Sequence, residues 1–318
     1  MASCLRKVAY SQNKEVTMAE QLFTNDIIIA WLQYFAKNTP VDLEQVKMLD
    51  ITRKNKNLIP TVESHRVTLA FMEAGDADIF YQMWNAGLGD CEVWYNEGSE
   101  PEGEIKHDTV SDMIHRGINA SAGMLVVNPN ARNTSKIGMD NMNFKKGSVR
   151  YVGSEIRAVI QNKMQVARED DVCIISAASI AIEAAMMASE GSVIAVEYSR
   201  NDRMTIEENV DYFGLRNVTV IDHVDEETMK NCPVPSLVML VASASMEQEL
   251  DCLMKLNPKL RVVIYTLDFK VAALLPSLLE KYSIKDAEVI QISVCKLNNK
   301  NAFDQQPAPW IITGQPED

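Results

Sequence analysis

The sequence predicts an α/β protein whose C-terminal part, residues 151–318, forms a Rossmann-like sheet of about seven strands, preceded by a smaller α/β domain. Three observations predict this fold. Short apolar runs rich in β-branched residues recur from residue 172 onward, as expected of buried strands. Helix-like stretches separate these runs, and the second run ends on an acid, Glu197. Strands that alternate with helices in this way form a doubly wound parallel sheet.

The elements of the C-terminal part follow in a regular order. A helix with apolar Ile156, Ile160 and Met164 at helical spacing leads into a strand over 171–175. Residues 176–179 turn out of this strand, and a helix rich in Ala and Met follows over 180–189. The remaining strands are predicted over residues 193–196, 218–221, 237–241, 260–265, 288–297 and 310–313.

The candidate site residues follow the first three strands. Ligands of open parallel sheets bind beyond the carboxyl ends of the strands. Glu197 comes about twenty residues after the first turn, the spacing at which an acid accepts hydrogen bonds from both hydroxyls of a ribose. This spacing favours a cofactor that contains adenosine. For His223, a surface histidine in a loop is the competing interpretation. The positions beyond these strands are Ser176, Ala177, Ala178, Ser179, Glu197, Asp222 and His223.

An ordered series of segments carries a resemblance to a known family. The series reads Ser-Glu-Ile-Arg-Ala at 154–158, Ile-Glu-Ala-Ala at 182–185, Val-Ile-Ala-Val-Glu at 193–197 and Glu-Asn-Val-Asp-Tyr-Phe-Gly-Leu-Arg-Asn-Val at 208–218. It resembles the methyltransferase part of the precorrin-6Y C5,15-methyltransferases (decarboxylating), enzymes of cobalamin biosynthesis that use S-adenosylmethionine. The resemblance covers roughly residues 60 to 315 and continues through segments 240–249, 266–268 and 292–294.

The segments upstream of this series resemble the end of the tetrapyrrole methylase that is fused before it in the bifunctional enzymes. They are 86–94 and 124–128, with Gly138-Met139-Asp140 and Phe144 at the junction. Residues 20 to 130 alternate α and β, with strands predicted over 67–71, 91–95 and 124–127 and a short helix over 41–49. The glycine-rich first half of that methylase is not recognisable. We therefore expect a truncated domain without its own cofactor cleft, with a structural role. The predicted domains are 1–150, linker included, and 151–318.

The resemblance implies a fold and a set of site residues. It implies a class I methyltransferase sheet whose last two strands are antiparallel. It implies S-adenosylmethionine at the positions beyond the first three strands and a tetrapyrrole substrate at Ala242, Ser243 and Ser245, after the fourth strand. A helix N-cap is the competing interpretation of Ser245. We also expect a homo-oligomer.

This sequence departs from the family pattern at two loops that are rich in glycine in the family. They are the first turn and residues 241–245, which read Val-Ala-Ser-Ala-Ser here. The family has Asp-x-Gly-x-Gly-x-Gly at the first turn, but here Val172 or Cys173 replaces the acid and residues 176–179 contain no glycine. A Cβ atom blocks the close backbone approach that glycine allows. We therefore expect weak or absent binding of S-adenosylmethionine, through Glu197 if at all. Two hypotheses follow: a methyltransferase acting on a precorrin-6Y-like tetrapyrrole, or a catalytically degenerate relative acting as a binding or scaffolding protein.

Composition excludes other classes of function. The chain has 318 residues and a formal net charge of −13, which disfavours nucleic acid and anionic membranes as partners. No apolar run is long enough to span a bilayer. The cysteines lack metal-ligand spacing and suggest a reducing cytoplasm, so we expect no metal. They are Cys4, Cys91, Cys173, Cys232, Cys252 and Cys295.

Overall fold

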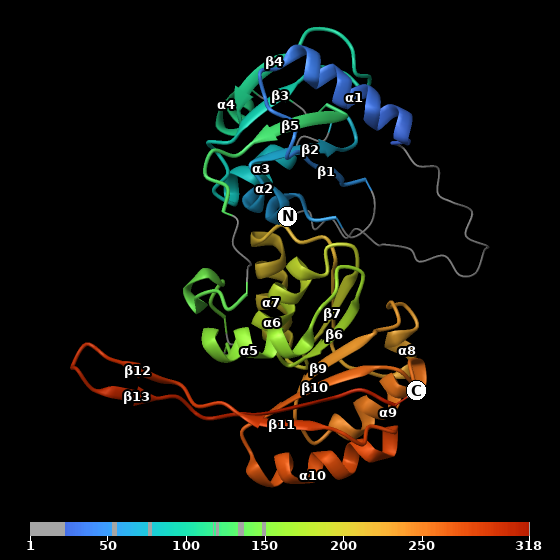
Figure 1. Ribbon diagram of the computed structural model, residues 1–318, viewed down its shortest axis with the longest axis vertical. Helices are drawn as coiled ribbons and strands as arrows, with labels where there is room; N and C mark the ends of the chain where they lie inside the picture. The colour runs from blue at the N-terminus through green and yellow to red at the C-terminus, as the bar shows by residue number, and fades with distance from the viewer. Residues whose placement is uncertain are drawn as a thin grey trace.

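The computed structural model describes residues 23–52, 56–75, 78–116, 118, 121–132, 137–147 and 151–317. Within these residues the chain builds a five-stranded sheet near the N-terminus and a seven-stranded sheet near the C-terminus, and each sheet has its own apolar core (Figure 1). The predicted fold, a sheet of seven strands preceded by a smaller α/β unit, is confirmed.

The seven-stranded sheet has the order β11-β14-β10-β9-β6-β7-β8. Five neighbouring strands, from β10 to β8, are parallel, and β14 runs antiparallel to both β10 and β11. Val172 pairs with Val193, so the first two predicted strands are adjacent and parallel as expected. The strands are β6 (Asp171–Ile175), β7 (Ser192–Val196), β8 (Val218–Ile221), β9 (Leu237–Val241), β10 (Arg261–Thr266), β11 (Glu288–Gln291) and β14 (Trp310–Gly314).

Helices cover both faces of this sheet because successive strand residues point to opposite sides. Val172 and Ile174 of β6 pack under α5, α6 and α7, whereas Cys173 and Ile175 pack under α8, α9 and α10. The connection from α6 to β7 requires Gly191, because a Cβ atom there would lie 2.0 Å from the Asp170 carbonyl oxygen. The helices are α5 (Ser154–Met164), α6 (Ala178–Met187), α7 (Arg200–Tyr212), α8 (Glu226–Met229), α9 (Met246–Leu256) and α10 (Phe269–Leu279).

The strand predicted over 288–297 is interrupted. After β11 the chain continues into a separate hairpin of β12 (Cys295–Leu297) and β13 (Phe303–Gln305), which projects from the body as an arm (Figure 1). The turn of this hairpin has Asn301 at φ +56°, a backbone conformation that asparagine tolerates better than most residues. Residues 303–305, which lie between the predicted strands 288–297 and 310–313, are therefore also a strand.

The N-terminal sheet has the order β1-β2-β5-β3-β4, with β1 parallel to β2 and the other pairs antiparallel. Helix α1 covers one face, where Gly123 leaves room for the ring of Trp31, and α2, α3 and α4 cover the other. The short helix predicted over 41–49 is wrong, because Lys47–Asp50 pairs with β2 and this pairing overrides local propensity. The elements are α1 (Asn25–Asn38), β1 (Lys47–Asp50), α2 (Leu58–Ser64), β2 (Val67–Phe71), α3 (Ile79–Asn85), β3 (Glu92–Tyr95), β4 (Lys106–Thr109), α4 (Val110–Arg116) and β5 (Gly123–Val127).

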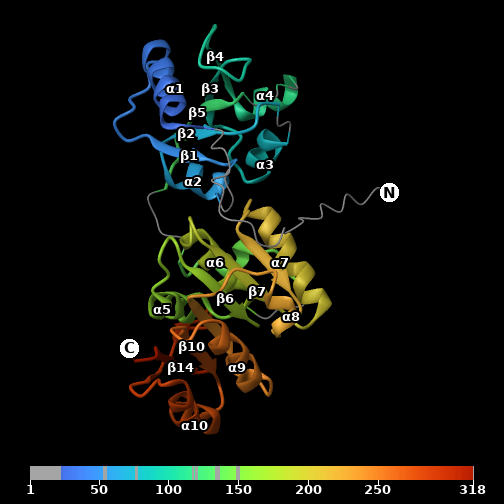
Figure 2. The same cartoon turned by 90° about the vertical axis from the view of Figure 1, so that its right-hand side faces the viewer.

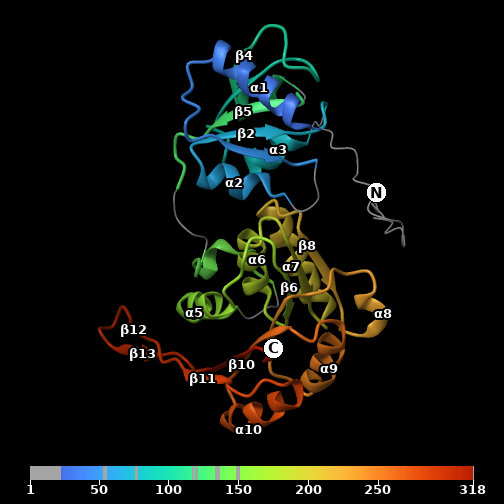
Figure 3. The ribbon, with the colours of Figure 1, turned by 45° about the vertical axis from the view of Figure 1, so that its right-hand side comes forward.

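The N-terminal domain contacts the amino edge of the C-terminal sheet. Helix α2 lies at the junction, beside α6 and α7 (Figure 2, Figure 3). The buried Asn57 side chain donates to the Asn217 amide oxygen at 2.9 Å and accepts from the Arg216 backbone N–H at 2.8 Å. Segment 137–147 packs on the C-terminal core through Phe144, although the sequence assigns it to the linker. The domain boundary at residue 150 stays a prediction.

Candidate functional site

The candidate residues lie together because parallel strands end at the same edge of a sheet. Ser176 follows β6, Glu197 follows β7, Asp222 follows β8 and Ala242 follows β9. Strands β9, β6, β7 and β8 are consecutive neighbours, so these positions line one edge in that order. The contacts of the N-terminal domain through Asn57 are at the opposite, amino edge.

The turn after β6 follows a backbone path that usually needs glycine. Ser176 has φ +58°, in the left-handed region, and its N–H donates to the Val196 carbonyl oxygen at 2.9 Å. Ala177 is the N-cap of α6 and has no side chain that can cap it. The methyl groups of Ala177 and Ala178 are buried in the apolar core. The turn therefore has a backbone conformation typical of glycine at Ser176, and the next two residues add buried methyl groups that glycine lacks.

Ser179 belongs to a buried ion-pair network. Its hydroxyl accepts from Nη1 of Arg157 at 3.2 Å, and Nε of Arg157 donates to Glu183 at 2.7 Å. Both charged side chains are 0% exposed. Glu183 also accepts from the backbone N–H groups of Gly138 and Met139. The Ser179 hydroxyl thus contributes to holding the linker on α5 and α6.

Glu197 is a buried acid at the tip of β7. The residue is 7% exposed, and no hydrogen bond to its carboxyl comes from the described residues. Burial raises the pKa of this carboxyl and the Asp202 carboxylate adds to the rise, while Arg203 opposes it, so that the pKa lies at about 7. Nη1 of Arg203 donates to the carbonyl oxygens of Glu197 and Tyr198, which fixes the backbone at the tip of the strand. Glu197 is therefore an acceptor without a hydrogen-bonded donor in the described structure.

Asp222 and His223 lie exposed beyond β8. Nδ1 of His223 is 2.6 Å from Asp222 and Nε2 is 3.0 Å from Asp225. Hydrogen bonds to these two carboxylates raise the pKa of the imidazole. Asp225 also caps α8 together with Thr228, and the backbone and side chain of Thr228 lower the pKa of that carboxyl to about 2. His223 is therefore held between two carboxylates, one at each ring nitrogen.

A hydrogen-bonded chain joins the ends of β7 and β9 across the end of β6. Tyr198 Oη lies 3.3 Å from Ser245 Oγ, which donates to Glu249 Oε1 at 3.0 Å. Ser243 Oγ lies 3.0 Å from Ser245 Oγ. Ser245 is the N-cap of α9, as the competing interpretation predicted, but its side chain bonds to Glu249 and makes no capping bond.

The sequence did not point to Glu249. This residue is 2% exposed, and its buried Oε2 atom has no hydrogen-bond partner among the residues that the structure describes. Burial raises the pKa of the carboxyl to about 7. The carboxyl edge therefore has two buried acids, Glu197 and Glu249, on either side of β6.

Apolar side chains extend the same edge beyond β10. Leu267 is 55% exposed and Phe269 is 66% exposed. The Phe269 ring lies 5.8 Å from the ring of Trp310, which begins β14. Exposed side chains of this size are typical of surfaces that bind a partner or ligand.

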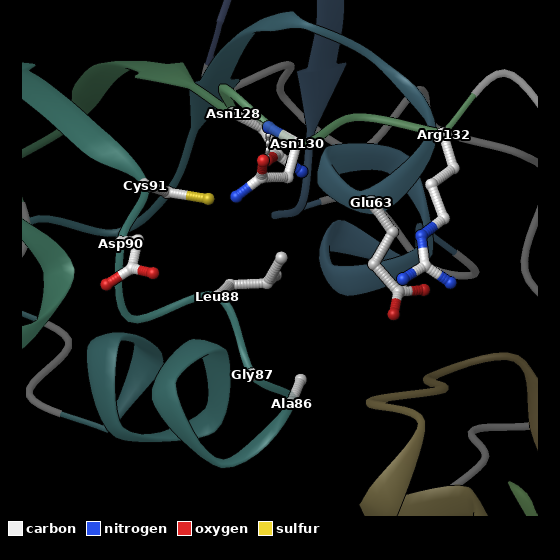
Figure 4. A pocket seen from close by; sticks show the side chains of 9 residues that line it. All are labelled: Glu63, Ala86, Gly87, Leu88, Asp90, Cys91, Asn128, Asn130 and Arg132. Carbon is white, nitrogen blue, oxygen red and sulfur yellow. Dashed lines mark hydrogen bonds between the residues drawn. The ribbon is translucent and has the colours of Figure 1, made fainter.

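A separate cavity of about 210 Å³ lies in the N-terminal domain (Figure 4). Glu63 of α2 and Arg132 after β5 line one side, and Asp90 and Cys91 before β3 line another. Burial and the Asp90 carboxylate raise the pKa of the Cys91 thiol to about 12, which disfavours thiolate chemistry. The cavity is smaller than the ~300–1,000 Å³ of ordinary ligand pockets. The absence of a cofactor cleft in this domain stays a prediction.

Within the ranges that the structure describes, no three or more His, Cys, Asp or Glu side chains gather in a way that could hold a metal ion. None of the helices in those ranges is both long and apolar enough to cross a bilayer.

A doubly wound sheet with a final antiparallel strand and its candidate residues at the carboxyl edge defines a Rossmann-like protein of the methyltransferase type. The family model of the precorrin methyltransferase domain matches residues 131–306. The chain belongs to this family.

A solved structure agrees with the fold. Precorrin-6Y C5,15-methyltransferase from Geobacter metallireducens is similar at 24% identity, with a TM-score of 0.53 over 57% of this chain and 98% of that one. The C-terminal domain of precorrin-6Y C5,15-methyltransferase from Rhodobacter capsulatus has 17% identity and a TM-score of 0.47 over 57% of this chain and 99% of that one. No curated protein matches the sequence.

Proposed function

We propose that the chain is a methyltransferase that uses S-adenosylmethionine and acts on a precorrin-6Y-like tetrapyrrole in cobalamin biosynthesis. One observation carries the proposal: in a chain of this family, a buried acid without a hydrogen-bonded donor, Glu197, ends the strand next to the first turn. A carboxyl that receives no hydrogen bond from the described residues can accept hydrogen bonds from a ligand that supplies donors, such as the hydroxyls of a ribose.

The residues at this edge fit the adenosine end of the cofactor. Glu197 would accept the two ribose hydroxyls, and Asp222 and His223 would lie near the base. At the first turn, Ser176 already has the left-handed backbone that glycine provides in the family, although its Cβ narrows the approach. The bound cofactor supplies an activated methyl group on a sulfonium. Methyl transfer from such a group depends mainly on alignment and proximity, which the chain provides by binding both partners at one edge.

The substrate side is supported by the chemistry of the neighbouring residues. Ala242, Ser243 and Ser245 after β9 lie between the cofactor positions and the apolar side chains beyond β10. Tyr198, Leu267 and Phe269 are large and exposed at this edge. A tetrapyrrole has broad apolar faces, and aromatic side chains bury much area against such surfaces.

A degenerate binding or scaffolding protein is the second candidate. The buried Ala177 and Ala178 methyl groups and the bond between Tyr198 and Ser245 favour it, because both occupy space at the end of β6. In the proposed enzyme, Tyr198 and Ser245 separate when the cofactor binds. In the degenerate protein they stay bonded.

We further propose a homo-oligomer in the cytoplasm. The hairpin of β12 and β13 exposes Leu297 by 59% and Phe303 by 73%. An isolated two-stranded hairpin is marginally stable in water, so contact with a second copy of the chain would stabilise it.

Incubation with S-adenosylmethionine and a precorrin-6Y-type tetrapyrrole tests the activity. Mass spectrometry of the pigment should show added methyl groups. A tetrapyrrole that binds, detected by its absorbance spectrum, but gains no methyl group would favour the degenerate protein.

A further inference from the structure

A cavity of about 170 Å³ lies where the two domains meet. Lys47, the first residue of β1, lines it from the N-terminal domain. Arg168, Ser189 and Glu190 line it from the C-terminal domain, in the segments just before β6 and β7. Because these segments precede the strands, the cavity is at the amino edge of the sheet, opposite to Glu197.

The positive charge in this cavity exceeds the negative charge. Glu190 pairs with Lys56 across the domain junction. The side chains of Lys47 and Arg168 form no ion pair or hydrogen bond with any residue in the described ranges. Burial lowers the pKa of the Lys47 ammonium, and the nearby Arg168 guanidinium lowers it further. Lys47 and Arg168 thus line one cavity as two like charges, and the Glu190 carboxylate of the same cavity pairs with Lys56 instead of with either of them.

The walls of the cavity are held by well-defined contacts. Asn57, which also lines it, is 4% exposed and bonds to Asn217 and Arg216 of the other domain. The Arg168 carbonyl oxygen accepts the backbone N–H groups of Glu190 and Gly191, both at 2.8 Å. The Ser189 hydroxyl forms no hydrogen bond within the part of the chain that the structure describes. It can therefore serve as a further donor.

We propose that this cavity binds a phosphoryl oxyanion, as inorganic phosphate or as the phosphate group of a small ester, between Lys47 and Arg168. A guanidinium and an ammonium are the side chains that recognise phosphate oxygens best, the first as a fork and the second as a point charge. The volume suits one small anion, being below the ~300–1,000 Å³ of ordinary ligand pockets. The net charge of −13 disfavours long polyanions. The bound anion would connect the two domains.

Phosphate titration of the full chain tests this site. Binding is followed by calorimetry at constant ionic strength, with chloride replacing phosphate in the reference. The wild type should bind inorganic phosphate saturably. Lys47→Met and Arg168→Met should each weaken the affinity roughly tenfold or more, because each removes a charge-assisted hydrogen bond. Lys285→Met is the matched control: that lysine is exposed, pairs with Glu317 far from the cavity and should leave the affinity unchanged.

Thermal unfolding adds a second measurement. Without phosphate, neither cavity variant should unfold at a lower temperature than the wild type, since each removes a repelling charge. Phenyl phosphate in place of phosphate distinguishes the two sources of the anion. It should bind only if the site takes the phosphate group of an ester, whose organic part then projects out of the cavity. No saturable binding to the wild type, or equal phosphate affinity in the wild type and both cavity variants, would overturn the proposal.

Discussion

The buried carboxyl of Glu249 should make stability fall as the pH rises. Burial raises its pKa to about 7 from the ordinary value of 4.5, so between these pH values the folded protein binds more protons than the unfolded chain. Stability from the protonated form is then present at low pH and declines as the pH rises through this window. Glu249→Gln removes this dependence. Between pH 4.5 and pH 8 the unfolding free energy of the variant should therefore rise relative to that of the wild type by up to ~3 kcal/mol.

Urea unfolding at several pH values measures this shift. Glu247→Gln, two residues away and paired with Lys281 on the exposed side of α9, serves as the control and should retain the pH dependence of the wild type. Parallel pH profiles for Glu249→Gln and the wild type would show that the acid is solvated in the folded protein.

The ion pair of Arg157 and Glu183 should be essential for folding. Both side chains are fully buried, and the arginine also donates to Asn141 and to the Val152 carbonyl oxygen. Removing one partner leaves the other charge buried and unpaired, so Arg157→Leu should cost about 3–5 kcal/mol of unfolding free energy. Arg116→Leu, which removes an ion pair at a side chain 55% exposed, should cost about 0–1 kcal/mol. Chemical denaturation that finds equal costs would contradict this account.

The sequence contained part of the signal for this pair. Arg157 lies on the buried stripe of α5 with Ile160, Gln161 and Met164. A charge on an apolar helix face signals a buried partner, but the partner cannot be identified from the sequence. Glu183 is in another helix, and the two meet only when α5 and α6 pack on the same face of the sheet.

The turn after β6 offers a test at the scale of one element. Ser176 is held at φ +58°, a conformation that costs a residue with a Cβ atom roughly 1–2 kcal/mol. Glycine avoids this cost, but it loses more conformational entropy on folding, which cancels part of the gain. Ser176→Gly should therefore stabilise the protein by about 0.5–1 kcal/mol. It should also strengthen the binding of S-adenosylhomocysteine, because removing the Cβ opens the approach to the backbone.

Gln165→Gly is the matched control for this turn. Gln165 ends α5 at φ 47°, at the opposite edge of the sheet, so glycine there should raise thermal stability similarly without changing ligand affinity. If both variants change the ligand affinity equally, the turn after β6 has no particular role in binding.

The exposed hairpin of β12 and β13 should determine the oligomeric state of the chain in solution. Phe303→Ser should shift the protein toward monomers in sedimentation velocity, because it removes the most exposed apolar side chain of the hairpin. Ile29→Ser, at an exposed apolar residue of α1, should leave the oligomer unchanged. A wild-type monomer at high concentration would contradict the proposed homo-oligomer.

Across the whole molecule, elements with a strong local pattern were predictable and contacts between distant elements were not. The runs at 172–175 and 193–196 predicted adjacent strands because both are short, β-branched and separated by a helix. Ser176 and Glu197 could be assigned to one edge because they follow those strands. Glu249 carries no such signal, since its proximity to Tyr198 depends on β7 and β9 flanking β6. The helix predicted over 41–49 includes most of β1, because the strand that pairs with β1 lies outside the local sequence window.

Calorimetric titration with S-adenosylhomocysteine measures whether Glu197 anchors the cofactor at the carboxyl edge of the sheet. The wild type should bind weakly, and Glu197→Ala should reduce the affinity by roughly tenfold or more, since each lost charge-assisted hydrogen bond contributes about 1.5–3 kcal/mol. Glu247→Gln should bind like the wild type. A micromolar affinity that Glu197→Ala leaves unchanged would contradict the role of Glu197, and no heat from the wild type would contradict cofactor binding itself.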